Sequence, residues 1–222
     1  MSMLPRRTFL QATFVAGLAL AACTKTRHAS KDEDEAAVTP GEDLMQEHGV
    51  VERILLLYEE AARRIEHNEP LDLSVVTNSA GIVRRFVEDY HERLEEQQVF
   101  PRLQKVRREV GLVTTLLKQH ERGRQVTDEI LRLSQGSDRA NLAQLLRGFA
   151  RMYRPHAARE DTVIFPALRA ILSGDQYREL GEQFEAKEHS TLGERGFEDT
   201  ITEVARLEAT LGIADLAAFT QP

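Results

Sequence analysis

Hydrophobic residues recur at intervals of three and four positions along most of the chain after residue 42. Leu44, Val51 and Leu55, for example, share one stripe of a helix, and His48 lies within it. This spacing is typical of amphipathic α-helices, whose apolar stripe faces a core. No stretch alternates apolar and polar residues for long enough to predict a strand. The pattern therefore predicts an all-α protein.

Turn residues divide this pattern into segments. We expect long helices over roughly 42–67, 73–108, 112–134 and 138–172, and shorter ones over 175–190 and 195–211. Gly111 should separate the second and third helices, and Pro101 and Pro166 should kink or break the helices that contain them. Long helices with short connections predict an up-down four-helix bundle over residues 42–172. Residues 173–222 are then a C-terminal helical extension packed on that bundle.

The N-terminus resembles an export signal rather than part of this fold. The pair Arg6-Arg7 precedes an apolar run that is shorter than the ~20 residues of a membrane span. The run ends in Leu-Ala-Ala-Cys, which resembles the lipobox of bacterial lipoproteins. We therefore expect a twin-arginine signal peptide over 1–22, and a lipidated Cys23 with a flexible linker over 23–41. The protein is expected on the periplasmic or extracellular side, with its lipid anchored in a membrane.

The composition limits the partners of the chain. Asp and Glu number 36 against 29 Lys and Arg, which gives a net charge of −7. Nucleic acid is not expected as a partner, because phosphate binding needs a basic face. Cys23 is the sole cysteine, so neither a disulfide framework nor a cysteine metal cluster is possible within one chain. The sequence leaves the oligomeric state open.

A repeated segment carries the candidate chemistry. Residues 91–103 and 156–168 match in register, each with His, then Glu four residues later, then Phe-Pro and Leu. Each copy follows a predicted helix that carries an isolated histidine. Residues four apart share one face of a helix, so each His and Glu can reach the same site. The six expected ligands are His48, His91, Glu95, His120, His156 and Glu160.

This donor set favours two metal ions over one. Six ligands are too many for one tetrahedral zinc, whereas a glutamate can bridge two ions through its two oxygens. The mixture of imidazole and carboxylate favours iron, with manganese or another divalent metal second. A zinc-protease motif is not present here, because Glu95 stands where that motif needs its second histidine.

The paired motifs resemble those of the hemerythrin family, in its bacterial hemerythrin-like branch of HHE cation-binding domains. The resemblance covers roughly residues 42–170, and implies a non-heme di-iron centre whose ligands are the six residues above. Oxygen-carrying hemerythrins have a second histidine on the third helix, where this chain has Arg124. Their fourth-helix carboxylate lies five residues after its histidine, at Asp161 here, whereas Glu160 lies four after. These differences imply a more open centre with fewer imidazoles.

Three functions are compatible with such a centre. The first is binding of oxygen, nitric oxide or peroxide for sensing, storage or detoxification. The second is an enzyme with peroxidase-like, catalase-like or nitric oxide-reducing activity, and the third is an iron store or a non-catalytic helical scaffold. Two further residues are candidates near the site. We expect Tyr153 to pack on the inward face, with a bound oxygen species as its alternative partner. We expect His189 to be a surface residue rather than a seventh ligand.

Overall fold

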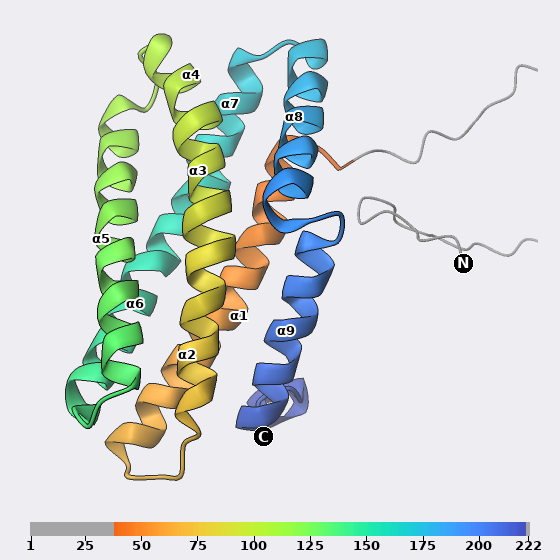
Figure 1. Ribbon diagram of the computed structural model, residues 1–222. Helices are drawn as coiled ribbons and strands as arrows, with labels where there is room; N and C mark the ends of the chain where they lie inside the picture. The colour runs from red at the N-terminus through yellow and green to blue at the C-terminus, as the bar shows by residue number, and fades with distance from the viewer. Residues whose placement is uncertain (1–37, 221–222) are drawn as a thin grey trace, which may run out of the picture. The chain divides into compact units, whose positions relative to one another are not determined.

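The computed structural model describes residues 38–220. The predicted signal peptide, Cys23 and most of the predicted linker lie outside these residues. Helices make up nearly all of the described chain, which contains no strand, so the predicted all-α class is confirmed (Figure 1). Between residues 38 and 220, no helix combines the length and the apolar character that crossing a membrane requires.

The first helix, α1 (Pro40–Glu66), begins two residues before its predicted start. The Thr39 side chain accepts a hydrogen bond from the Glu42 backbone N–H, and the Glu42 side chain accepts one from the Thr39 backbone N–H. This reciprocal capping box satisfies two backbone donors that a helix start leaves free. The adjacent proline favours the first turn because its φ is already helical. These local signals explain the earlier start.

The second long helix is a composite of α-helical and π-helical segments. It comprises α2 (Leu73–Ile82), the π-helix η1 (Val83–His91), α3 (Glu92–Leu94), the π-helix η2 (Glu95–Val99) and α4 (Phe100–Lys105). A π-helix makes wider turns than an α-helix and often marks a functional site. Because the wider turns change the periodicity, they alter which side chains face the interior.

The chain does not break at Pro101 or Pro166, and the prediction that Gly111 separates two helices is wrong. Each proline is the second residue of an α-helical segment that directly follows a π-helical one. The change of helix type occurs where the proline has no N–H to donate, so the chain continues as a helix. The break falls at 106–109, where Arg107 and Glu109 adopt left-handed φ values of 57° and 54°. Gly111 lies inside the next helix.

The remaining bundle helices are α5 (Val110–Ser134), α6 (Arg139–Arg159), the π-helix η3 (Glu160–Ile164) and α7 (Phe165–Ile171). Helix α6 packs against both α1 and α5, and α2 packs against α5 (Figure 1). The arrangement is the predicted helical bundle with short connections. Its interior is apolar around Tyr58 and Phe149, whose rings meet edge-on at 5.5 Å.

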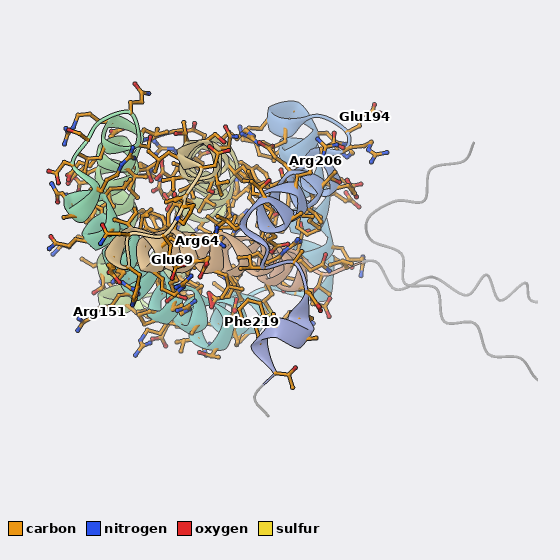
Figure 2. The ribbon with its side chains drawn as sticks, turned by 90° about the horizontal axis from the view of Figure 1, so that it is seen from below. Arg64, Glu69, Arg151, Glu194, Arg206 and Phe219 are labelled. Atoms are coloured by element: carbon orange, nitrogen blue, oxygen red, sulfur yellow. The ribbon has the colours of Figure 1, made fainter. Side chains whose placement is uncertain are left out.

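Two further helices, α8 (Gly174–Leu192) and α9 (Gly196–Leu211), pack beside α1, and a 3-10 turn follows at Leu216–Phe219. The Gly41 backbone N–H donates to the Tyr177 hydroxyl at 2.9 Å, which joins α8 to the start of α1. A Cβ at position 41 would lie 2.7 Å from that hydroxyl, so the contact requires glycine. Charged side chains such as Arg151 and Glu194 extend outward from the helices (Figure 2).

Candidate metal centre

The structure brings the six predicted ligands together inside the bundle. His48 lies on α1, His120 on α5 and His156 on α6. His91 is the last residue of η1, and the two glutamates are the first residues of η2 and η3. None of the six is more than 7% exposed. The π-helical segments therefore start or end at three of these residues.

The four imidazoles form two pairs. The Nε2 atoms of His48 and His91 are 3.1 Å apart, and those of His120 and His156 are also 3.1 Å apart. Each pair joins a single histidine to a histidine of the repeated motif. Two ring nitrogens that face each other at this distance are close enough to be ligands of one cation.

Each glutamate lies between the two pairs of histidines. Glu95 Oε2 is 3.7 Å from the Nε2 of His91 and 3.6 Å from that of His120. Glu160 Oε2 is 3.0 Å from the Nε2 of His156 and 3.5 Å from that of His48. Since each carboxylate approaches one histidine of each pair, either glutamate could hold a cation together with a pair of these histidines.

The two glutamates lack hydrogen-bond donors within the described part of the chain, and a metal ion would compensate their charge. Both oxygens of Glu95 and both of Glu160 are buried, and none accepts a hydrogen bond from the described residues. Burying a carboxylate without a hydrogen bond or a countercharge costs on the order of several kcal/mol. A cation in contact with these oxygens removes that cost. The donor set therefore fits a pair of metal ions.

Each histidine is also held from its outer side. Every Nδ1 lies within hydrogen-bond distance of a side-chain oxygen, which can only accept, so each Nδ1 carries a proton and each Nε2 is the ring nitrogen directed at the cluster. The outer partners are Asp161 for His48 (2.6 Å), Glu47 for His91 (2.8 Å), Glu96 for His120 (3.2 Å) and Gln119 for His156 (3.0 Å). Such outer hydrogen bonds orient imidazole ligands in metal sites.

These outer partners were not predicted from the sequence, although each lies next to a predicted ligand in the chain. Glu47 and Gln119 each precede a single histidine by one residue, and Glu96 and Asp161 each follow a predicted glutamate ligand by one. The repeat therefore extends to the second layer of the site. Neighbouring residues on a helix point in different directions, so sequence spacing alone gave no reason to place them together.

Two phenylalanines of the repeat form apolar walls of the site. The Phe165 ring stacks on His48 with centroids 5.5 Å apart, and the Phe100 ring stacks on His120 at 5.6 Å. Both rings are buried. Each therefore packs on the single histidine of the other half of the repeat and shields it from water.

Burial and charge set the protonation of the cluster. Burial lowers the pKa of His91 to about 3 and that of His120 to about 4, so both rings are neutral at pH 7. Burial also lowers the pKa of His48, but the hydrogen bond to Asp161 and the nearby carboxylate of Glu160 outweigh it and raise this pKa to about 9. Burial raises the pKa of Glu95 well above its usual value, and the charge of Glu160 adds to this effect. Protons and metal ions therefore compete for the same atoms.

Arg124 occupies a cation position beside the cluster. Its Nη2 lies 2.6 Å from Glu96 Oε1 and 2.7 Å from Glu92 Oε2. Glu92, Glu96 and His120 could themselves hold a cation, and the guanidinium already lies between the two carboxylates. Arg124 therefore supplies a fixed positive charge at the position where oxygen-carrying hemerythrins have a histidine.

Tyr153 packs beside the cluster, as expected, and also donates a hydrogen bond that was not predicted. Its ring stacks on Phe149 and lies 5.3 Å from the His156 ring, while its hydroxyl donates to Glu92. A Cβ at Gly123 would lie 2.9 Å from that hydroxyl, so glycine leaves space for the tyrosine. His189 is exposed on α8 and is not brought to the cluster.

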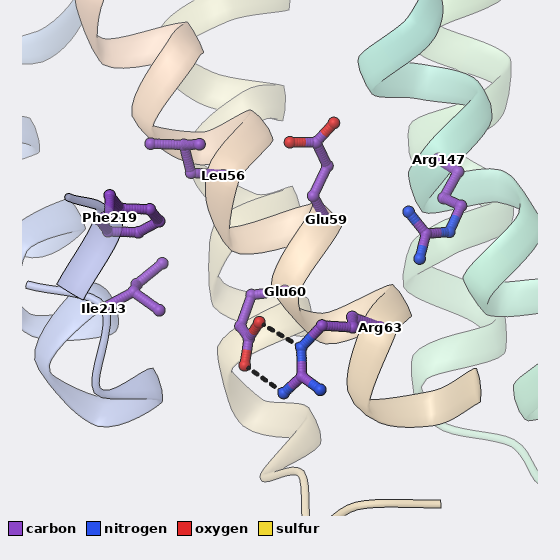
Figure 3. Close-up of a pocket in the computed structure, with 7 residues that line it drawn as sticks. All are labelled: Leu56, Glu59, Glu60, Arg63, Arg147, Ile213 and Phe219. Carbon is purple, nitrogen blue, oxygen red and sulfur yellow. Dashed lines mark hydrogen bonds and ion pairs between the residues drawn. The ribbon is translucent and has the colours of Figure 1, made fainter. Parts of the chain in front are cut away.

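A groove on the outside of the bundle lies apart from this cluster (Figure 3). Within it, the guanidinium of Arg63 pairs with Glu60 across one turn of α1, and Phe219 lies opposite on the C-terminal segment. The residues that line the groove are Leu56, Glu59, Glu60, Arg63, Arg147, Ile213 and Phe219. They include none of the six clustered residues.

The fold and the site define a four-helix bundle with a buried cluster of four histidines and two glutamates, of the kind that holds metal ions. Residues 39–168 match the model of the hemerythrin HHE cation binding domain, and the chain belongs to this family. Domains of this family bind metal ions, typically iron. Uncharacterized proteins of Mycobacterium bovis and Mycobacterium tuberculosis are each 43% identical over 216 residues, covering 91% of this chain and 85% of theirs. No solved structure matches the chain significantly.

The Arg124 network yields a prediction for stability. Replacing Arg124 by Met leaves the buried Glu92 without its cation, so we expect the free energy of unfolding to fall by about 3 kcal/mol. As a control, Arg122→Met removes an exposed pair with Glu129 on the same helix and should cost less than about 1 kcal/mol. Urea unfolding of both variants measures the difference. Equal, small losses would show that solvent screens the Arg124 pairs.

Proposed function

We propose that this chain is a non-heme di-iron protein that binds oxygen, nitric oxide or peroxide for sensing, storage or detoxification. The observation that carries the proposal is the pair of buried glutamates, Glu95 and Glu160, each lying between two pairs of histidines. Four imidazole nitrogens and two carboxylates shared between them suit two iron ions better than one zinc.

Different residues of the chain have different roles in such a centre. When bound, ferrous ions supply electrons and free coordination positions for small molecules. The histidines and glutamates hold the metal, and the outer hydrogen bonds fix the direction of each imidazole. Phe100 and Phe165 stack on two of the ligands and exclude water from that side. The site is therefore built for a small reactant rather than for a large substrate.

Metal analysis tests the proposal directly. We expect the chain purified in air to contain about two irons, with near-ultraviolet absorption that changes when azide or peroxide is added. The double variant His91→Ala and His156→Ala removes one nitrogen from each pair, so its iron content should fall to near zero. His189→Ala removes an exposed histidine on α8 and should retain the metal. A wild-type protein that contains no iron and takes up none after reconstitution would exclude the proposal.

Arg124 favours a second candidate function, an enzyme that reduces peroxide or nitric oxide. Its guanidinium contacts Glu96, the outer partner of His120, so a fixed positive charge lies beside one half of the cluster. Such a charge stabilises negative charge that develops during a reduction. A centre that only carries oxygen does not need this feature.

Turnover separates the two candidates. If the chain is an enzyme, the iron-loaded protein should consume hydrogen peroxide, or reduce nitric oxide, faster than the same amount of free iron. Arg124→Gln should slow this reaction by about tenfold or more, because one stabilising charge is lost. Iron content and azide binding measured on the same samples provide the control. Rates equal to that of free iron would leave binding as the function.

The proposal includes export by the twin-arginine route and a lipid on Cys23, which lies outside the described residues. Such an anchor would hold the iron centre at a membrane surface. In cells fed a labelled fatty acid, we expect the wild-type chain to carry label and to remain with the membranes. The Cys23→Ser variant should lose both properties while its iron content is unchanged. Label on the serine variant would exclude this anchor.

A further inference from the structure

The two halves of the cluster are alike in position but differ in the charge of their outer partners. His91 Nδ1 donates to the carboxylate of Glu47 at 2.8 Å. At the equivalent place in the other half, His156 Nδ1 donates to the amide oxygen of Gln119 at 3.0 Å. The two partners have the same shape and the same location in the repeat, so the substitution changes mainly the charge.

The other pair of outer partners differs in the same direction. His48 Nδ1 bonds to Asp161 at 2.6 Å, whereas His120 Nδ1 lies at 3.2 Å from Glu96. The Glu96 oxygen that faces His120 also accepts a hydrogen bond from Arg124 at 2.6 Å. Part of the negative charge of Glu96 is therefore directed to the guanidinium instead of the histidine.

Burial adds to the electrostatic difference between the two halves of the cluster. Glu47 is fully buried, and its second oxygen accepts a hydrogen bond from the buried Tyr90 hydroxyl at 2.9 Å. The carboxylate is thus fixed in an interior where water does not screen its charge. Gln119 is partly exposed and contributes no net charge. A carboxylate on the outer nitrogen strengthens an imidazole ligand, and losing such a partner typically costs 10- to 100-fold in metal affinity.

We propose that the two metal positions are unequal, and that the position at His48 and His91 binds its ion first and more tightly than the position at His120 and His156. This inference rests on the proposed di-metal function. Glu95 and Glu160 lie between both pairs, so they do not favour either position. The difference in affinity comes from the outer hydrogen-bond partners. The position at His120 and His156, which lies beside Arg124, is therefore the one that loses its ion more readily.

Reciprocal, nearly isosteric substitutions test this inference. The protein is stripped of metal and titrated with cobalt(II), and the heat and the visible absorption of each binding step are recorded. In the wild type we expect two steps that differ by about tenfold or more in affinity. Glu47→Gln should weaken the first step by about tenfold, and Gln119→Glu should strengthen the second by about tenfold. In both variants the two steps should therefore converge.

The control is Glu52→Gln, which removes a charge from the same helix as Glu47 at a side chain that is 51% exposed and pairs with Arg154. Its titration should match that of the wild type. Equal steps in the wild type, or a Glu47→Gln variant that weakens only the second step, would overturn the inference. If Glu47→Gln does not fold, Gln119→Glu decides alone. Iron analysis of the protein before it is stripped of metal separates the two claims. Two irons with equal cobalt steps would overturn only the inference, whereas a chain that neither contains nor takes up iron would overturn the proposed function.

Discussion

The stability of the bundle interior depends on how the negative charges of two buried carboxylates are compensated. Glu95 and Glu160 have no hydrogen-bond donors for their oxygens among the described residues. Each uncompensated carboxylate costs on the order of several kcal/mol, and a domain of ordinary stability has about 5–15 kcal/mol in total. Four imidazole nitrogens around the carboxylates, and a cation among them, turn this cost into binding energy. Metal uptake and folding are therefore linked in this chain.

A duplicated pattern builds the site. Each half supplies a single histidine, a histidine and glutamate four residues apart, and a phenylalanine that stacks on the other half's single histidine. The arrangement of the six central residues is therefore nearly symmetric, with two nitrogens in each pair of histidines and two carboxylates near both pairs. The outer partners differ, since Glu47 in one half corresponds to Gln119 in the other. A difference in the outer partners can make two bound ions unequal without changing any residue that would contact the metal.

The sequence predicted the all-α class and the residues that cluster, because periodicity and the repeated motif depend on local spacing. It did not predict the π-helical segments, since a wider turn leaves no distinct residue pattern. For the same reason it did not predict that the chain continues as a helix through Pro101 and Pro166. The boundary at Arg107 and Glu109 was also missed, because non-glycine residues rarely adopt left-handed backbone angles. Outer partners such as Glu47 depend on packing between helices, which one sequence does not show.

Arg124 sets the charge beside one half of the cluster. Glu92, Glu96 and His120 lie close enough to hold a further cation, and they adjoin the main cluster. The guanidinium lies between the two carboxylates and is tethered to α5, so it supplies their countercharge without competing for the inner nitrogens. An arginine is always charged, whereas a histidine at this position would be a further metal ligand. The chain therefore has a permanent positive charge where a further imidazole could stand, beside the half of the cluster that contains His120.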